Sequence, residues 1–426
     1  MRPRYPLPAS DRPMTRVSGE PPDQPPGHAT RDSLRVGLIP APEMPQQLIE
    51  SILEELPSLF GRYIDDRHEW QVFSETDPLI GAEESTDEML HQARKMKRYK
   101  AWDYAICVTD LPVYRRHRLV IAEASETCRV ALLSQPALGA SPLRRRIREA
   151  ILHLLNEMHH GSSEAARRNQ QDHNREQRQS RRRHGLRNTD ARHLMGRRLS
   201  EVIAPIQRIS PDESSARISV RFIAQRHVAG HCRLLAGMVR ANSPWRIFPA
   251  FRKVIAVAFA TGTYGLLFPT LWQLSNAYEL WRFALLTIAS MTAMVAWIVI
   301  AHGLWEPQRH HRAFPMATLY NLTTLITLGI GVLFYYIMLL LLFLGTVIIF
   351  VPLSLLQSTL GQEVSLWFYP AMAWLAASVA TFVGALGSAL ESDATVREAT
   401  YGYRQRSRQQ RVQKLLEEEE STEGSS

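Results

Sequence analysis

Charged side chains are absent from one long stretch of this sequence. Residues 313–362 contain no Asp, Glu, Lys or Arg, although these residue types make up 21% of the 426-residue chain. An ordinary soluble domain does not need so long an uncharged run, whereas a segment that crosses lipid does. The second half of the chain is therefore predicted to lie in a bilayer.

Cysteine is scarce, which argues against two kinds of cross-link that stabilise small folds, disulfides and structural zinc sites. Cys107, Cys128 and Cys232 are the only three, and none of them lies in a CxxC or CxxH pattern. Neither a disulfide framework nor a structural zinc site is expected, and the thiols should stay reduced in a cytosolic compartment. No apolar run lies near the N-terminus, so a cleaved signal peptide is not expected.

Large apolar side chains are also rare in two other segments. Eight prolines lie within residues 1–32, and a segment of this kind cannot bury enough surface to fold, so residues 1–33 are predicted to be a disordered tail. Residues 161–200 are rich in Arg, Gln, Asn, His and Ser, which predicts a basic linker.

Residues 34–160 have the pattern of one compact α/β domain with a mixed sheet. Short apolar runs predict strands, and apolar residues at helical spacing predict helices. Strands are expected at residues 34–39, 70–73, 104–109, 119–122 and 130–133, and helices at 48–60, 89–99 and 142–159. The resulting order, β-α-β-α-β-β-β-α, is typical of a single α/β layer structure.

Residues 201–253 combine apolar periodicity with regularly placed basic side chains. A basic amphipathic segment just before a membrane span is typical of contact with anionic lipid headgroups. The residues predicted to lie at the membrane surface are Arg226, Arg233, Arg240, Arg246, Arg252 and Lys253. Nucleic acid is not an expected partner, because the linker arginines lack interleaved aromatic residues.

Four spans account best for the charges around residues 254–390. The candidates are residues 254–274, 283–301, 319–356 and 367–390. With four spans, the basic segments before the first span, in the loop 302–317 and in the charged tail 391–426 share one side, as the positive-inside rule requires. Both termini are then cytosolic, and the protein belongs in a bacterial inner membrane. Residues 319–356 form either one long helix or a helix broken near Pro352.

The predicted spans contain no ionisable residue, which argues against a coupled transporter. In the last span, Ala380, Gly384 and Ser388 recur at four-residue spacing and predict a face for close helix packing. This face either packs inside the bundle or joins two copies of the chain in a homo-oligomer.

The helix predicted at 142–159 carries the strongest chemical motif. In a zinc peptidase helix of the H-E-x-x-H type, two imidazoles bind the ion and the glutamate activates a water molecule. His153 matches the first position, but Leu154 stands at the position of the base and Glu157 at that of the second ligand. Hydrolysis would have no proton acceptor there.

The surroundings of this helix resemble the archaemetzincin-type minimal zinc peptidases, with a degenerate zinc motif. The resemblance covers residues 104–160 and implies a zincin-like fold. Only His153 fits a ligand position, and Ser163 stands where the third ligand belongs. The stretches that carry the resemblance, besides the helix itself, are residues 108–111, 122–124 and 130–134.

Two weaker candidate sites stay open. A metal ion held by His153, His159 and His160, with Glu157 nearby, is an alternative to an ordinary polar helix end. Asp110 follows a buried strand, which is a common place for active-site residues, and a turn or capping role is the alternative.

The whole chain also resembles an uncharacterised family of bacterial four-span membrane proteins. The resemblance is carried by Leu-Gly-Ser-Ala-Leu-Glu-Ser-Asp at 386–393 and Tyr-Gly-Tyr-Arg-Gln-Arg at 401–406. Proteins of this family are associated with the label methylene-tetrahydrofolate dehydrogenase, so the resemblance implies that activity. However, Gly37 stands alone after the first strand, without the GxGxxG that cradles a dinucleotide, so no cofactor is expected.

The leading hypothesis is a non-enzymatic membrane protein whose cytosolic α/β domain acts as a sensor or scaffold and regulates an unknown protein partner. The alternatives are a membrane-tethered metal-dependent hydrolase, built around Asp110, His153 and Glu157, and a small transporter or channel subunit.

Overall fold

The structure is a computed structural model, and it describes most of the two predicted halves of the chain. Several predicted features lie outside the described residues: the Pro-rich tail, most of the basic linker, Arg246 and the charged tail. The described residues are 33–81, 85–115, 118–163, 205–210, 218–242, 251–305, 316–361 and 365–387, with 165, 168 and 244 as isolated positions.

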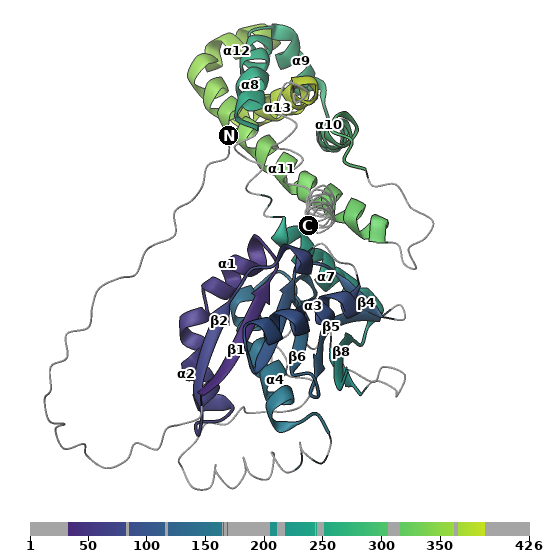
Figure 1. Cartoon of the computed structure of the whole chain (residues 1–426). Helices are drawn as coiled ribbons and strands as arrows, with labels where there is room; N and C mark the ends of the chain where they lie inside the picture. Colours follow the sequence, from purple (N-terminus) through teal and green to yellow (C-terminus); the bar gives the residue numbers. More distant parts are fainter. Residues whose placement is uncertain are drawn as a thin grey trace, which may run out of the picture.

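The described part of the N-terminal half forms a mixed eight-stranded sheet (Figure 1). The strand order is β2-β1-β3-β6-β5-β8-β7, with β4 paired to β5. Strands β2, β1, β3 and β6 are parallel, whereas β5, β8 and β7 continue the sheet antiparallel. The strands are β1 (Ser33–Pro40), β2 (Glu69–Ser74), β3 (Tyr104–Thr109), β4 (Val113–Arg115), β5 (Arg118–Ser125), β6 (Val130–Ser134), β7 (Ile206–Ile209) and β8 (Val220–Ala224).

Helices cover the sheet, and all the residues of β3 and β6 are buried as a result. Continuous apolar strands of this kind are typical of parallel sheets covered on both faces. Helix α3 packs on β3 and β6, while α4 packs on β3, β5 and β6 and also against α2. The helical segments are α1 (Met44–Glu50), η1 (Leu53–Glu55), α2 (Leu56–Tyr63), η2 (Pro78–Gly81), α3 (Thr86–Tyr99), η3 (Pro136–Leu138), α4 (Leu143–His160) and α7 (His227–Ala241).

The predicted mixed sheet is confirmed, but the sheet domain extends beyond the predicted boundary at residue 160. Strands β7 and β8 were expected in a membrane-proximal segment, and instead β8 pairs with β5. The physical reason is the open edge of β5, which β8 fills with four buried apolar residues out of five. Helix α7 packs against η3, where the position of a Cβ on Gly237 would lie 2.1 Å from the carbonyl oxygen of Pro136.

The described C-terminal half contains three helices that are long and apolar enough to cross a membrane: α10, α11 and α13. The count rises to four only if α8 and α9, which meet at an angle of 87°, form one bent span. The helices are α8 (Arg252–Leu266), α9 (Pro269–Ala277), α10 (Leu280–Ala301), α11 (Met316–Phe350), α12 (Leu353–Leu360) and α13 (Phe368–Gly387).

The predicted first span, residues 254–274, is therefore not one straight helix, and four spans are not confirmed. The break lies at Phe268 and Pro269. Proline has no N–H to donate and disfavours helical geometry in the residue before it. Phe268 is accordingly extended, with φ −91° and ψ 126°.

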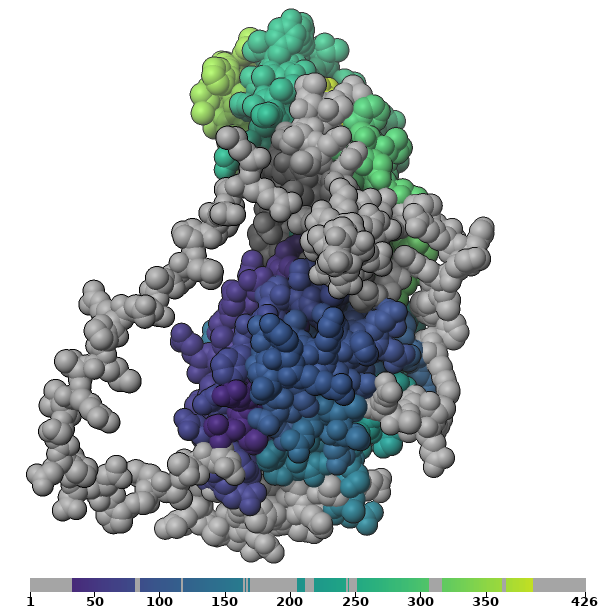
Figure 2. Space-filling view, viewed as in Figure 1, coloured from purple at the N-terminus to yellow at the C-terminus, as the bar shows by residue number. Residues whose placement is uncertain are grey.

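Helix α11 answers the question left open for residues 319–356. It ends at Phe350, and Pro352 separates it from α12, so the segment is a broken helix. Its 35 residues are about 52 Å long, well beyond the roughly 30 Å of a hydrocarbon core. The excess packs on the sheet domain, because Leu319 and Tyr320 belong to its core. Figure 2 shows the apolar helices at one end of the molecule and the sheet domain at the other.

Helix α13 lies at the centre of the membrane helices and packs against α8, α10 and α11. A Cβ on Gly384 would lie 2.0 Å from the hydroxyl oxygen of Tyr335 and 3.5 Å from Ala258. Ala380 on the same face is buried. Gly384 and Ala380, the described part of the small-residue face, thus pack inside the bundle. Ser388 lies outside the described residues, and a homo-oligomer stays a prediction.

Candidate functional site

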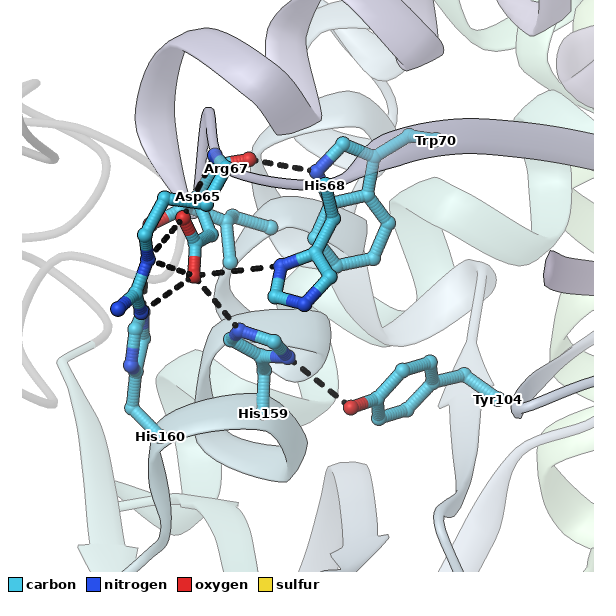
Figure 3. A network of polar contacts seen from close by, with 8 residues as sticks. Asp65, Arg67, His68, Trp70, Tyr104, His159 and His160 are labelled. Carbon is cyan, nitrogen blue, oxygen red and sulfur yellow. Dashed lines mark hydrogen bonds and ion pairs between the residues drawn. The ribbon is translucent and has the colours of Figure 1, made fainter. Parts of the chain in front are cut away.

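A polar cluster lies at the edge of the sheet where the parallel strands begin (Figure 3). Asp65 and His68 come from the turn between α2 and β2, and His159 comes from the last turn of α4. Among the described residues this is the only group of three His, Cys, Asp or Glu side chains placed to hold a metal ion. One ligand atom of each lies within 4.8 Å of the others.

The carboxylate of Asp65 lies between the two imidazoles. Its Oδ2 atom is 3.5 Å from Nδ1 of His68 and 3.4 Å from Nε2 of His159. The second ring nitrogen of His159, Nδ1, is 3.0 Å from the hydroxyl oxygen of Tyr104, at the start of β3. Two helix–strand junctions and one strand therefore contribute to a single small site.

Backbone contacts fix Asp65 in this position. Its N–H donates to the carbonyl oxygen of Phe60 at 3.2 Å, which continues the end of α2. Its own carbonyl oxygen accepts a hydrogen bond from the indole nitrogen of Trp70 at 2.7 Å. Trp70 is buried and packs edge-on against Phe60, with ring centroids 5.6 Å apart. The turn that carries the carboxylate is thus tied to both α2 and β2.

Arg67 also binds this carboxylate. Its backbone N–H and Nε donate to Oδ1 at 2.9 and 3.1 Å, and Nη2 donates to Oδ2 at 2.8 Å. Burial alone would raise the pKa of Asp65, but hydrogen bonds and charge from Arg67, together with a hydrogen bond from His159, hold that pKa well below its usual value. Asp65 is therefore ionised although only 7% of it is exposed.

His159 is neutral at physiological pH. Burial lowers its pKa to about 4, and the neighbouring His160 adds to this shift, while Asp65 opposes it. A neutral imidazole has one nitrogen with a free lone pair, which is the form that binds metal ions. Its Nε2 faces the carboxylate of Asp65 and its Nδ1 faces the hydroxyl of Tyr104, so these two neighbours together set the tautomer.

The predicted candidates on α4 do not form a peptidase site. Leu154, at the position of the base, is fully buried in the core. Glu157 forms an ion pair with Arg208 of β7, with Oε1 accepting from Nε at 3.2 Å and Oε2 from Nη2 at 2.8 Å. Its carboxylate is therefore occupied by a partner that the sequence did not reveal. His153 is half-buried and does not join the described metal-ligand group.

Asp110 is buried, and it follows the carboxyl end of β3. The end of α4 lies near Tyr104, at the amino end of the same strand. The length of β3 separates these two ends by roughly 17 Å. Asp110 and Glu157 therefore lie toward opposite ends of this strand, and a hydrolase built around Asp110, His153 and Glu157 stays a prediction.

Only one of the three histidines predicted as metal ligands belongs to the cluster. His159 does, whereas Nε2 of His160 faces the carbonyl oxygen of Ile64 at 3.2 Å. Sequence reasoning missed Asp65 and His68. Their Asp-x-x-His spacing in a short turn was a weak signal, and the third residue lies 91 positions further along the chain.

The predicted membrane-surface residues divide in two. Arg233 is buried in α7 and is not at a surface, which corrects that prediction. Its helix packs on the sheet domain with the face that was expected to meet lipid. The described remainder of the set is exposed: Arg226, Arg240, Arg252 and Lys253.

Comparison with known proteins gives the cluster no precedent. No family model, no curated protein and no solved structure matches this chain. The two resemblances described for the sequence therefore stay predictions, and the chemistry of the site is argued from its own geometry.

We expect the free energy of unfolding of the sheet domain to fall as the pH is lowered from about 6.5 to about 4. The measurement is made with a chelator, so that no metal ion is bound to His159. The unfolded chain binds a proton on His159 near pH 6.5, whereas the folded chain does so only near pH 4. Acid therefore favours the unfolded state, by roughly 3 kcal/mol in full. Melting of the full chain in detergent at several pH values measures the slope. His159→Gln should flatten it, and an equal slope in both proteins would contradict the assignment.

Proposed function

We propose that this chain is a multi-pass protein of a bacterial inner membrane whose cytosolic sheet domain regulates a protein partner without catalysis. The observation that carries the proposal is the sharing of α11 between the sheet domain and the membrane helices. A structural change in the sheet domain is therefore transmitted through α11 to the membrane helices, and the reverse also holds, since packed elements transmit small shifts rather than absorbing them.

The shared contact is made by side chains along the first third of α11. Leu319 and Tyr320 lie in the core of the sheet domain. Further along, the hydroxyl of Thr323 lies 3.7 Å from the sulfur of Met238 on α7. The amide nitrogen of Asn242, just after α7, donates to the hydroxyl oxygen of Thr327 at 3.1 Å. The contact is therefore both apolar and hydrogen-bonded, and it extends over more than two helical turns.

The chemistry of the described residues favours regulation over catalysis or transport. The carboxylate of Glu157 forms an ion pair with Arg208, which holds it in a structural contact. Helices α11 and α13 contain no Asp, Glu, His, Lys or Arg. Ion pathways and proton relays through membranes usually need such residues.

Orientation follows from the same helix. Because the start of α11 packs on the sheet domain, this end of the helix lies on that domain's side of the membrane. The sequence just before α11 contains Arg309 and Arg312, and basic segments next to a span stay in the cytosol. We therefore propose that the sheet domain is cytosolic, with both termini on its side if α8 and α9 form one bent crossing.

Loss of the shared contact should weaken the sheet domain. Leu319→Ala removes a buried side chain, and such truncations cost about 2–5 kcal/mol. Leu322→Ala, on the same part of the same helix, removes a side chain that is 40% exposed and should change little. The melting temperature of the full chain in detergent distinguishes them. Equal melting temperatures for the two variants would show that α11 does not stabilise the sheet domain.

The exposed thiol of Cys232 on α7 reports the side of the membrane. In a Cys128→Ser background, a membrane-impermeant maleimide should label Cys232 in inside-out vesicles and not in intact spheroplasts. Cys107 is buried, so it should not react, and Cys232→Ser should abolish the signal. Labelling of intact spheroplasts would place the sheet domain outside the cytosol.

The absence of catalysis is tested on the purified full chain. Incubated with unfolded protein substrates and Zn²⁺, it should release no more peptide than buffer does, because Leu154 and not a glutamate stands at the position of the general base. Hydrolysis that a chelator stops and that His153→Ala abolishes would make the chain a metallopeptidase. Hydrolysis that survives His153→Ala would place the active site elsewhere and would equally overturn a non-enzymatic function.

A further inference from the structure

We propose that Asp65, His68 and His159 bind a divalent transition-metal ion of the Zn²⁺ class. This site goes beyond the proposed regulatory function and does not depend on it. Two imidazole nitrogens and one carboxylate oxygen are a ligand set that Zn²⁺ uses in proteins, with a fourth position left for water or an external ligand.

The two ligand-atom separations that involve Asp65 fit a tetrahedral ion. Bonds of about 2.0–2.1 Å place two ligand atoms of a tetrahedron about 3.3–3.4 Å apart. Oδ2 of Asp65 lies 3.5 Å from Nδ1 of His68 and 3.4 Å from Nε2 of His159. Both separations are long for hydrogen bonds with good geometry, and both are close to what a shared ion requires.

The nitrogen of His68 gives a second, independent indication. Its Nδ1 atom is buried and has no hydrogen-bond partner among the described residues, although it faces Oδ2 of Asp65. Buried polar atoms are normally satisfied, and each exception needs an explanation. A metal ion between the two atoms would satisfy this nitrogen.

The supporting contacts are those that metal ligands usually have. A ligating imidazole typically uses its other nitrogen to bind a neighbour, which fixes the ring. Tyr104 fulfils that role for His159, with its hydroxyl oxygen 3.0 Å from Nδ1 (Figure 3). The second oxygen of Asp65, Oδ1, is held by the backbone N–H of Arg67 at 2.9 Å. Oδ2 faces the two imidazoles and also accepts from the guanidinium of Arg67.

The guanidinium of Arg67 competes with the ion for Oδ2, through Nη2 at 2.8 Å. This side chain is 77% exposed, so it can turn into solvent without losing packing. The backbone N–H of Arg67 keeps its contact with Oδ1 when the side chain moves. Arg67 therefore tunes the affinity of the site and does not block it.

The site faces away from the contact with the membrane helices. It lies at the amino ends of the parallel strands, whereas η3, on which α7 packs, follows the carboxyl end of β6. The side chain of His68 is 28% exposed, so an ion from solution can reach the open coordination position.

Metal binding is tested on the full chain, purified in detergent and stripped with a chelator. Equilibrium dialysis against buffered Zn²⁺, followed by elemental analysis, should detect one bound ion per wild-type chain. The affinity of His68→Ala for Zn²⁺ should be at least about 100-fold weaker. Tyr104→Phe, which keeps the ring, should weaken binding about 10–100-fold. Arg67→Ala should bind more tightly than the wild type. His91→Ala, an exposed histidine on α3, should bind like the wild type.

A spectroscopic measurement makes the result independent of folding losses. Co²⁺ bound by two nitrogens and an oxygen in a tetrahedral site should give visible absorption that His68→Ala lacks at an unchanged melting temperature. The proposal is overturned if the wild-type chain binds no stoichiometric ion. It is also overturned if His68→Ala and Tyr104→Phe both bind Zn²⁺ with wild-type affinity.

Discussion

The packing of α11 on α7 is the contact on which the architecture depends. A helix of 35 residues is longer than a bilayer needs. If nothing covered its excess length, apolar side chains there would be exposed to water. Leu319 and Tyr320 are instead buried with the sheet domain. The close approach of α7 to η3 at Gly237 holds the other side of this contact. The described parts of the two halves of the chain therefore pack directly against each other.

Burial of a charged carboxylate imposes the second constraint. An ionised Asp65 in a nearly closed site must be balanced by positive charge, because an unpaired buried charge is strongly unfavourable. In the structure Arg67 supplies that charge from the rim. A metal ion would supply this positive charge from a position between the three ligand atoms, and both imidazoles would bind it. The same carboxylate thus accounts for the ion pair in the absence of metal and for the binding site in its presence.

Local patterns predicted most of the sheet, and long-range contacts explain what was missed. Continuous apolar runs identified β3 and β6, because strands buried on both faces have that composition. The spacing of arginines in residues 221–240 fitted a lipid surface equally well, and only the free edge of β5 decides that β8 belongs to the sheet. The break before Pro269 was readable from the sequence. The cluster of Asp65 and His68 with His159 was not, because it forms only when α4 docks beside α2.

The position of β8 along the chain bears on how the protein is made. The sheet is incomplete until Ala224 has left the ribosome, and the first apolar helix begins at Arg252, about 28 residues later. At synthesis rates of about 5–20 residues per second, that interval lasts only a few seconds. Folding of the sheet domain and delivery of the apolar helices to the membrane must therefore overlap in time. A ribosome docked at the membrane would hold β7 and β8 close to the bilayer while they add to the edge of β5.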